Sequence, residues 1–332
     1  MTDNGSQALM TDNGSQVFTN GTRNDMNGIT KRLLTQLGDM ELVEKFVELP
    51  NSDFNSLMLK IFQSRASKLM PVDMVKAFQA NRFSVPSELN PVAYHDLETE
   101  FLSSAQEFGI KPVLLSPSAP FASSSVFGCV NQNNVVSAVR GTEILSDPTN
   151  MLSIIIADKL KNKKADNTMP IHYCATARVV RAQSFPNTDR HFTHFGIFCI
   201  VSSGKDSGSY GCESAMLQKQ LSFFKKLLLD KYDANLSIVL RKRLGYSDAD
   251  GFFNRMAELV KDEFPGVPLS LDTNYENNNY YKGINYGINM DKDGNQIEIG
   301  DGGFVDWMQS MTSNKKERCL ISGIGLDRLL LL

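Results

Sequence analysis

The sequence predicts an α+β fold in which a mostly antiparallel β-sheet is flanked by helices. Two long strand-like runs, at about 173–183 and 192–201, are joined by a polar segment that contains Pro186 and Asn187, as in a hairpin. A second hairpin is indicated where Asp291-Lys292-Asp293-Gly294 separates two further strand-like runs. Amphipathic helices lie between these hairpins along the chain. This order favours an α+β arrangement over repeated strand–helix–strand winding.

Three segments of different composition divide the chain. Residues 1–27 are rich in Asn, Gly, Ser, Thr and Asp and contain the heptapeptide MTDNGSQ twice, which predicts a disordered low-complexity tail. Residues 28–88 carry leucines at helical spacing, among them Leu33, Leu34 and Leu37, and predict a helical N-terminal segment. Residues 89–332 are expected to form the main domain, because both hairpins lie there.

Composition excludes several classes of protein. The 332 residues are 42% hydrophobic and 21% charged, as in ordinary globular chains, and no apolar run is long enough for a membrane-spanning helix. The formal net charge of −3 gives no general electrostatic attraction to nucleic acid. The five cysteines form no Cys-x-x-Cys pair, and the N-terminus lacks the pattern of a secretory signal. We therefore expect free thiols, no structural zinc site, no membrane partner and a cytoplasmic location.

The main domain opens with a well-delimited helix from Pro91 to Phe108. Asn90 is a suitable N-cap, Pro91 suits the first turn, and Gly109 suits the C-terminal end. Strand-like runs then follow at 113–115, 126–130 and 135–139. Later helices are expected at about 149–160, 217–228 and 252–259, and later strands at 268–271, 281–290, 296–299 and 320–324.

The first hairpin carries residues that suit an anion site. Arg181 and Gln183 share one face of the first strand by alternation, while Phe192, His194 and Phe198 share one face of the second. If the two faces coincide, an Arg, an amide, an aromatic ring and a His converge. A phosphate is then a natural partner for the guanidinium group. The alternative is an edge hairpin whose Arg reaches solvent.

Two glycine-rich segments in the second half are further candidates. Gly323-x-Gly325-x-Asp327-Arg328 resembles a strand-to-helix turn, and an Arg in a first helical turn opposes the helix dipole unless an anion balances it. The alternative is that Arg328 pairs with a neighbouring carboxylate. Turn chemistry alone is the alternative explanation for residues 277–283 and 300–303, which are rich in Asn and Gly.

Taken together and in order, these segments resemble the catalytic core of class II aminoacyl-tRNA synthetases, and within that class the histidyl-tRNA synthetase branch. The run from Ala177 to Gln183, a short loop, and the run from Arg190 to Gly196 resemble motif 2. The run from Gly323 to Arg328 resembles motif 3. The helix that begins at Pro91, with the strand after it, resembles motif 1, the dimer element. The resemblance covers about residues 91–332.

Shorter segments add to this resemblance. Tyr280-Tyr281-Lys282-Gly283 is similar to the Tyr-Tyr-Thr-Gly stretch of the histidyl branch, and the run from Gly302 to Asp306 is similar to its Gly-Gly-Arg-Tyr-Asp. The run from Ser146 to Thr149 looks like the Pro-Glu-x-Thr segment that opens a helix beside the amino acid. The fold implied is a class II synthetase-like antiparallel sheet with an N-terminal helical appendage.

The resemblance also implies an ATP site that contains Mg²⁺. Arg181 would bind the α-phosphate and Arg328 the γ-phosphate, and these two would be the catalytic residues. Arg190 would contact the outer phosphates, Phe192 would stack on adenine, and Gln183 would accept from the adenine amino group through its carbonyl oxygen. No residue is assigned as a metal ligand.

The acid-binding residues implied by the resemblance depart from the histidyl pattern. Asp147 and Thr149 would hold a substrate amino group, and Tyr280 and Tyr281 would line the pocket. The remaining substrate-facing positions are occupied by His194, Phe198 and Glu276, where the family has Gln, Glu and Arg. Two charges of the histidine pocket are thus removed or reversed, so we expect an acid other than histidine.

The sequence therefore predicts an ATP-dependent ligase that adenylates an amino or carboxylic acid and transfers it to an acceptor other than tRNA. The chain stops four residues after Arg328, so no C-terminal anticodon-binding domain is expected. One alternative is a catalytically inactive, histidyl-synthetase-like regulatory subunit of ATP phosphoribosyltransferase. Another is an atypical synthetase that contacts tRNA through residues 28–88. A homodimer through the motif 1-like region is the expected assembly.

Overall fold

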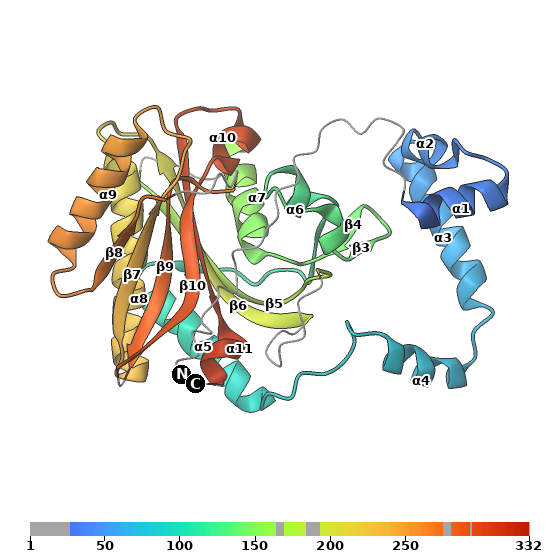
Figure 1. Cartoon of the computed structure of the whole chain (residues 1–332), viewed down its shortest axis with the longest axis horizontal. Coiled ribbons are helices and arrows are strands. Elements are labelled where there is room, and N and C mark those ends of the chain that lie inside the picture. Colours follow the sequence, from blue (N-terminus) through green and yellow to red (C-terminus); the bar gives the residue numbers. More distant parts are fainter. Residues whose placement is uncertain (1–26, 164–168, 184–192, 275–279, 293, 332) are drawn as a thin grey trace.

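An eight-stranded sheet forms the centre of the main domain (Figure 1). The computed structural model describes residues 27–163, 169–183, 193–274, 280–292 and 294–331. The strands lie in the order β1-β5-β6-β11-β10-β9-β7-β8. Only the pairs β1/β5 and β7/β8 are parallel among the pairs described for this sheet, which confirms the mostly antiparallel arrangement. The strands are β1 (Lys111–Pro112), β5 (Ile171–Val180), β6 (His194–Lys205), β7 (Asn235–Lys242), β8 (Leu269–Asp272), β9 (Lys282–Lys292), β10 (Asn295–Val305) and β11 (Glu317–Gly325).

Helices cover both faces of this sheet. One face, which we call the helix face, packs against α5 (Pro91–Glu107), α8 (Gly211–Tyr232), α9 (Ala249–Glu263) and α11 (Leu326–Leu330). The other face, which we call the site face, packs at its β5-β6-β11 side against α7 (Pro148–Lys161) and α10 (Trp307–Thr312). Each face has its own apolar core, and the one on the helix face is the larger.

A second, three-stranded sheet lies beside α7. It has the order β2-β4-β3 and is made of β2 (Ser118–Pro120), β3 (Ser137–Ala138) and β4 (Thr142–Ile144), with α6 (Ser123–Val126) and a short 3-10 helix (Gln132–Asn134) between them. The carboxylate of Glu143, fully buried on β4, accepts hydrogen bonds from the backbone N–H groups of Ala122 and Ser124. These bonds fold the chain back at 122–124, so the strand predicted at 126–130 is wrong.

Most of the predicted elements are confirmed. The helix predicted from Pro91 is α5, in which the Asn90 side chain accepts from the N–H groups of Val92 and Ala93, and Gly109 follows it with a φ of 73°. The hairpin of β9 and β10 is present, with Asn295 paired to Lys292. Strands β2, β4 and β7 were not predicted. β7 lies inside the main sheet, where Leu236, Ile238 and Leu240 are buried on the helix face.

The N-terminal segment forms four helices that stand apart from the sheet (Figure 1). They are α1 (Gly28–Leu37), α2 (Leu42–Val47), α3 (Asn51–Ala66) and α4 (Pro71–Ala80). Leu34 is their one buried residue, and apolar side chains such as Val47 and Phe62 are exposed. The predicted tail at 1–27 lies outside the described residues except for Asn27, which caps α1. No helix within the described part of the chain is long and apolar enough to span a membrane.

Candidate functional site

The register of β5 and β6 decides which residues of the first hairpin meet. Val180 pairs with His194 and Arg178 pairs with Gly196, and partners that lie directly opposite share one face of a sheet. His194 therefore lies on the same face as Arg178 and on the opposite face from Arg181. The predicted convergence of Arg181 with His194 and Phe198 is wrong, since a pairing offset of one residue moves a side chain to the other face.

Arg178 and His194 belong to a polar cluster on the helix face. The Arg178 guanidinium pairs with the buried carboxylate of Asp327 at 3.1 Å, and its Nε donates to Nδ1 of His194 at 3.1 Å. Nε2 of His194 donates to the carbonyl oxygen of Val85 at 2.6 Å. The Asp327 carboxylate also accepts from the N–H of Gly196 at 2.7 Å. This cluster joins β5, β6 and α11, and it leaves the imidazole engaged on the side away from the site face.

Phe198 is a core residue. It is fully buried and packs edge-on against Phe101 of α5, with its ring centroid 5.3 Å away, and against Phe223 of α8 at 5.6 Å. These contacts place it on the helix face. It therefore does not reach the residues expected to bind substrate, and its assignment to the substrate pocket is corrected.

Arg181 lies on the site face at the end of β5. Its guanidinium stands over the ring of Phe195, 5.2 Å from the ring centroid, and its Nε donates to the carbonyl oxygen of Ser146 at 3.2 Å. The N–H of Val180 donates to the carbonyl oxygen of Leu145. The chain entering α7 thus runs along the end of β5, which brings Arg181 next to Asp147.

The start of α7 supplies the next two predicted residues. Asp147 is the N-cap, and its Oδ1 accepts from the N–H and the hydroxyl of Thr149 at 2.9 Å and 2.7 Å. The hydroxyl of Tyr280 donates to the other oxygen of Asp147 at 3.4 Å. Burial raises the pKa of Tyr280 well above its ordinary value, with Asp147 and Asp301 adding to the increase and Arg181 opposing it. Three ionisable groups from separate segments, Asp147, Asp301 and Arg181, therefore act on this one hydroxyl.

Tyr281 connects this group to the sheet. It packs edge-on against Tyr280, with the centroids 4.7 Å apart, and its hydroxyl donates to Oδ2 of Asp301 on β10 at 3.0 Å. The pKa of Asp301 is raised to about 7, mainly by burial; Tyr281 and Arg241 act to lower it, and Glu298 and Asp147 act to raise it. A buried carboxyl with this pKa is neutral part of the time near pH 7, so it can donate or accept a hydrogen bond.

Strands β7, β9 and β10 form a polar surface beside Asp301. Arg241 of β7 lies 3.5 Å from the carboxylate of Glu298 on β10. Asn285 of β9, only 2% exposed, lies opposite Gly303 of β10 in the register. A Cβ atom at Gly303 would meet the ring of Tyr281 at 2.4 Å, so this glycine makes room for that ring.

Arg328 lies on α11, directly after the glycines of β11. A Cβ atom at Gly323 would have its nearest neighbour at 3.6 Å, and one at Gly325 at 3.8 Å, which are ordinary van der Waals contacts. Arg328 itself is half-buried. Within the described residues, no group of three or more His, Cys, Asp or Glu side chains is placed to hold a metal ion.

Solved structures share this arrangement of strands and helices. The S. aureus histidyl-tRNA synthetase matches with a TM-score of 0.54 and 12% identity, over 74% of this chain and 69% of its own. An ATP phosphoribosyltransferase regulatory subunit/histidyl-tRNA synthetase from Bacillus halodurans matches with a TM-score of 0.55 and 11% identity, over 75% of this chain and 81% of its own. The fold is that of a class II aminoacyl-tRNA synthetase.

A third solved structure agrees with this fold. A putative threonyl-tRNA synthetase from Aeropyrum pernix matches with a TM-score of 0.55 and 11% identity, over 71% of this chain and 58% of its own. No protein-family model and no curated protein sequence matches the chain. At these identities the likeness establishes the class II fold and leaves activity to be argued from the site.

The class II core of this chain brings together one subset of the predicted residues. Arg181, Asp147, Thr149, Tyr280 and Tyr281 meet on the site face. Gln183 lies at the base of the hairpin loop, where its backbone carbonyl accepts from Arg82 at 3.3 Å. Arg190, Phe192 and Glu276 lie outside the described residues.

Sequence reasoning missed several residues of this site. Asp301, Asn285 and Arg241 lie on strands whose alternation places them on the site face. The signal for Asp301 was its position between glycines in Gly300-Asp301-Gly302-Gly303, where small neighbours accompany one carboxylate. No sequence signal pointed to Arg241, because β7 itself was not predicted.

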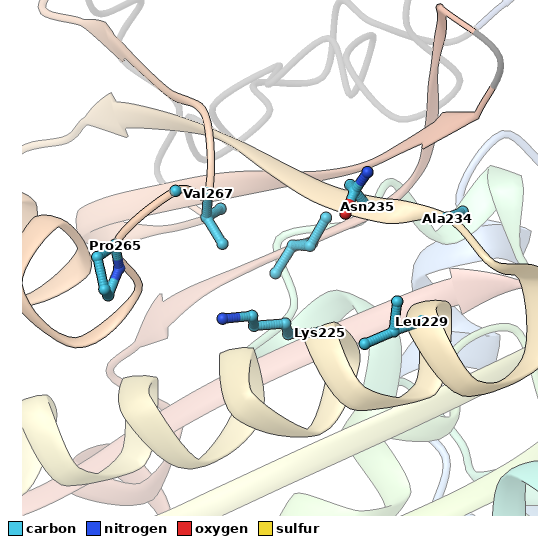
Figure 2. Close-up of a pocket in the computed structure, with 8 residues that line it drawn as sticks. Lys225, Leu229, Ala234, Asn235, Pro265 and Val267 are labelled. Carbon is cyan, nitrogen blue, oxygen red and sulfur yellow. The ribbon is translucent and has the colours of Figure 1, made fainter.

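A separate cavity lies away from these residues. It has a volume of about 230 Å³ and is enclosed by the second half of α8, the start of β7 and the loop before β8 (Figure 2). None of the predicted site residues lines it. Its lining is Lys225, Leu229, Ala234, Asn235, Leu236, Pro265, Gly266 and Val267.

Proposed function

We propose that this chain uses ATP to convert the carboxyl group of an amino or carboxylic acid into an acyl-adenylate, and that it transfers the acyl group to an acceptor other than tRNA. The observation that supports this most is the meeting of Arg181 with Asp147, Thr149, Tyr280 and Tyr281 on one face of a class II sheet. A cation beside an amine-binding group is what acid activation requires.

The chemistry assigns a role to each side chain. A carboxylate oxygen attacks the α-phosphorus of ATP, the new P–O bond forms, and pyrophosphate leaves. Negative charge increases on the phosphate oxygens, so Arg181 at the α-phosphate and Arg328 at the γ-phosphate stabilise the transition state. Arg190, Phe192 and Gln183 would bind the outer phosphates and adenine. Bound Mg²⁺ would neutralise part of the phosphate charge.

The acid would be held from the opposite side. Asp147 and Thr149 bind its amino group, and the rings of Tyr280 and Tyr281 form the wall of its pocket. His194 and Phe198 have no part in this pocket, because they contact the helix face. Two of the positions that face histidine in the family therefore do not contribute to this pocket, which supports an acid other than histidine.

Acid-dependent exchange between ATP and pyrophosphate tests the proposal. We expect exchange with at least one amino acid, and a loss of about 100-fold in Arg181→Ala, the size seen when one charge-stabilising group is removed. Arg255→Ala, an exposed position on α9, is the matched control and should retain exchange. Absence of exchange with every amino acid and carboxylic acid tried would contradict the proposal.

A regulatory role is the second candidate. Its support is the likeness to the Bacillus halodurans protein, which extends over 81% of that chain. A regulatory subunit of this kind would bind histidine without activating it. Calorimetry with histidine, together with copurification of a short phosphoribosyltransferase subunit, would support this role over the ligase.

The acceptor and the assembly belong to the same proposal. A net charge of −3 gives no general attraction to tRNA, so a gel shift with tRNA at low salt should show no complex; a salt-dependent complex would favour an atypical synthetase. Leu114, which is exposed and lies two residues after the edge strand β1, suits a homodimer through the motif 1-like region. Sedimentation should show a dimer that Leu114→Asp weakens.

All five cysteines are free, which suits a cytoplasmic location.

A further inference from the structure

Four residues on the neighbouring strands β9 and β10 form a square on the site face, which we call the floor. Asn285 lies opposite Gly303, and Gly287 lies opposite Asp301, so the two side chains stand on one diagonal and the two glycines on the other. All four share the site face, because residues two apart on a strand point to the same side. The floor therefore carries two side chains, those of Asp301 and Asn285, and both are buried.

Each glycine of the square lies beneath a larger side chain. A Cβ atom at Gly303 would meet the Tyr281 ring at 2.4 Å, and one at Gly287 would lie 3.1 Å from Nη1 of Arg241. Tyr281 and Arg241 thus form walls on two sides of the floor. Asp301 and Asn285 remain as the polar groups between them.

The floor presents buried hydrogen-bond acceptors. Asp301 is 8% exposed and accepts one bond, from the hydroxyl of Tyr281. Asn285 is 2% exposed, and its Oδ1 has no hydrogen-bond partner among the described residues. Leaving a buried acceptor unpaired is unfavourable, so a ligand that brings N–H donors would be stabilised here.

The surrounding charge is acidic. Glu298 and Asp147 both act on Asp301 in the direction that disfavours its ionised form, and Arg241, the cation that acts in the other direction, is shared with Glu298 at 3.5 Å. A positive charge brought to Asp301 would relieve this repulsion. Donors and positive charge together describe an ammonium, guanidinium or similar nitrogen group.

We propose that Asp301, Asn285 and the Tyr281 hydroxyl form a subsite for a cationic nitrogen group of the acid that this chain activates. The substrate class is then a basic amino acid, with one amino group at Asp147 and a second, positively charged nitrogen on the floor. This inference rests on the proposed adenylating function, which it deepens by naming the kind of acid.

Pairs of acids that differ in one charge test the subsite. The probes are arginine against citrulline and lysine against norleucine, each used in calorimetry without ATP and in ATP–pyrophosphate exchange with the full chain. We expect a basic acid to bind at least tenfold more tightly than its neutral counterpart. Asp301→Asn, which keeps the shape and an acceptor for Tyr281, should remove that preference, and Asn285→Leu should weaken binding of the basic acid.

Control measurements separate folding from binding. Asp250→Asn, an equivalent change at an exposed carboxylate on α9, should leave binding unchanged, and near-ultraviolet circular dichroism should show that each variant is folded. Equal binding of basic and neutral acids, or a preference that survives Asp301→Asn, would overturn the subsite.

The two assays also distinguish the subsite from the reaction. Exchange with neutral acids alone would uphold adenylation and overturn the subsite. Binding of a basic acid that depends on Asp301, without exchange for any acid, would uphold the subsite and overturn adenylation.

Discussion

The two faces of the main sheet come from the same strands but differ in what stabilises them. On the helix face, Phe198, Tyr286 and their neighbours are fully buried against four helices, and the partly exposed Arg178 pairs with the buried carboxylate of Asp327. On the site face, glycines alternate with Asp301 and Asn285. The helix face is stabilised by apolar packing. On the site face, at β9 and β10, polar side chains and glycines stand where apolar side chains would otherwise pack.

Each face also holds one titratable group whose pKa is shifted by burial. His172 on the helix face has its pKa lowered to about 4, and Asp301 on the site face has its pKa raised to about 7. Both shifts favour the neutral form. Because one group is a base and the other an acid, the stability of the two faces should respond to pH in opposite directions.

The largest expected effect is at Phe198. Removing its ring in Phe198→Ala leaves a cavity between α5 and α8, and the free energy of unfolding should fall by about 4 kcal/mol. Urea denaturation measures this, and Phe198→Leu, which retains most of the volume, should lose much less. If the Phe198→Ala protein is stable and binds the acid differently, Phe198 contributes to acid binding and its placement in the core alone is wrong.

Arg178 and Arg181 provide the most direct contrast between the faces. Arg178→Ala strands the buried carboxylate of Asp327 and should reduce the free energy of unfolding by about 3 kcal/mol. Arg181→Ala should change it by less than about 1 kcal/mol, because Arg181 bonds a backbone carbonyl near the other site residues, yet it should reduce exchange by about 100-fold. Matched urea denaturation and exchange assays on both variants check this. Equal losses of stability in the two variants would contradict a stabilising role for Arg178 and a purely functional role for Arg181.

Asp301→Asn should stabilise the protein. The unfolded carboxyl has a pKa of 3.8, and the folded one of about 7, so the folded state holds the extra proton between these values and stability falls as pH rises through this window. The variant has no carboxyl to ionise at this position, so its stability should not fall with pH in this way. It should be about 2 kcal/mol more stable than the parent at pH 8 and equal to it below pH 4. Urea midpoints measured across this range test the sign; a variant less stable at pH 8 would contradict it.

His172 should show the smallest effect, with the opposite sign. Nδ1 of this ring and the hydroxyl of Ser202 are 2.8 Å apart. Its folded pKa of about 4 lies below its ordinary value of 6.5, so stability is present above pH 6.5 and is lost as pH falls toward 4. The ring is only partly buried, so the loss should be about 1 kcal/mol. His172→Gln should flatten this acidic slope in the same urea series, and an unchanged slope would assign it to other groups.

The local elements of this fold could be predicted because their signals are local. The cap at Asn90, the proline after it and Gly109 delimit α5 within a few residues. The run of 126–130 looked like a strand from Val126 and Val130 alone, and the deciding interaction is the distant carboxylate of Glu143, which no local pattern reveals.

The candidate site was half predictable for a different reason. Motif order brought Arg181, Asp147 and Tyr280 into one proposal, and the structure places them together. Strand faces were not predictable, because the register of β5 and β6 depends on the geometry of the loop that joins them. A pairing shifted by one residue was enough to put His194 and Phe198 on the wrong side.

The chain that links the N-terminal helices to the main domain is hydrogen-bonded to residues next to the ends of β5 and β6. The guanidinium of Arg82 donates to the carbonyl oxygens of Ala182 and Gln183, and its own carbonyl accepts from the hydroxyl of Thr193 at 2.7 Å. Binding equilibria joined in this way are reciprocal. If nucleotide binds beside Arg181 as proposed, a molecule that engages α1–α4 and changes the affinity for nucleotide must have its own affinity changed by nucleotide by the same factor.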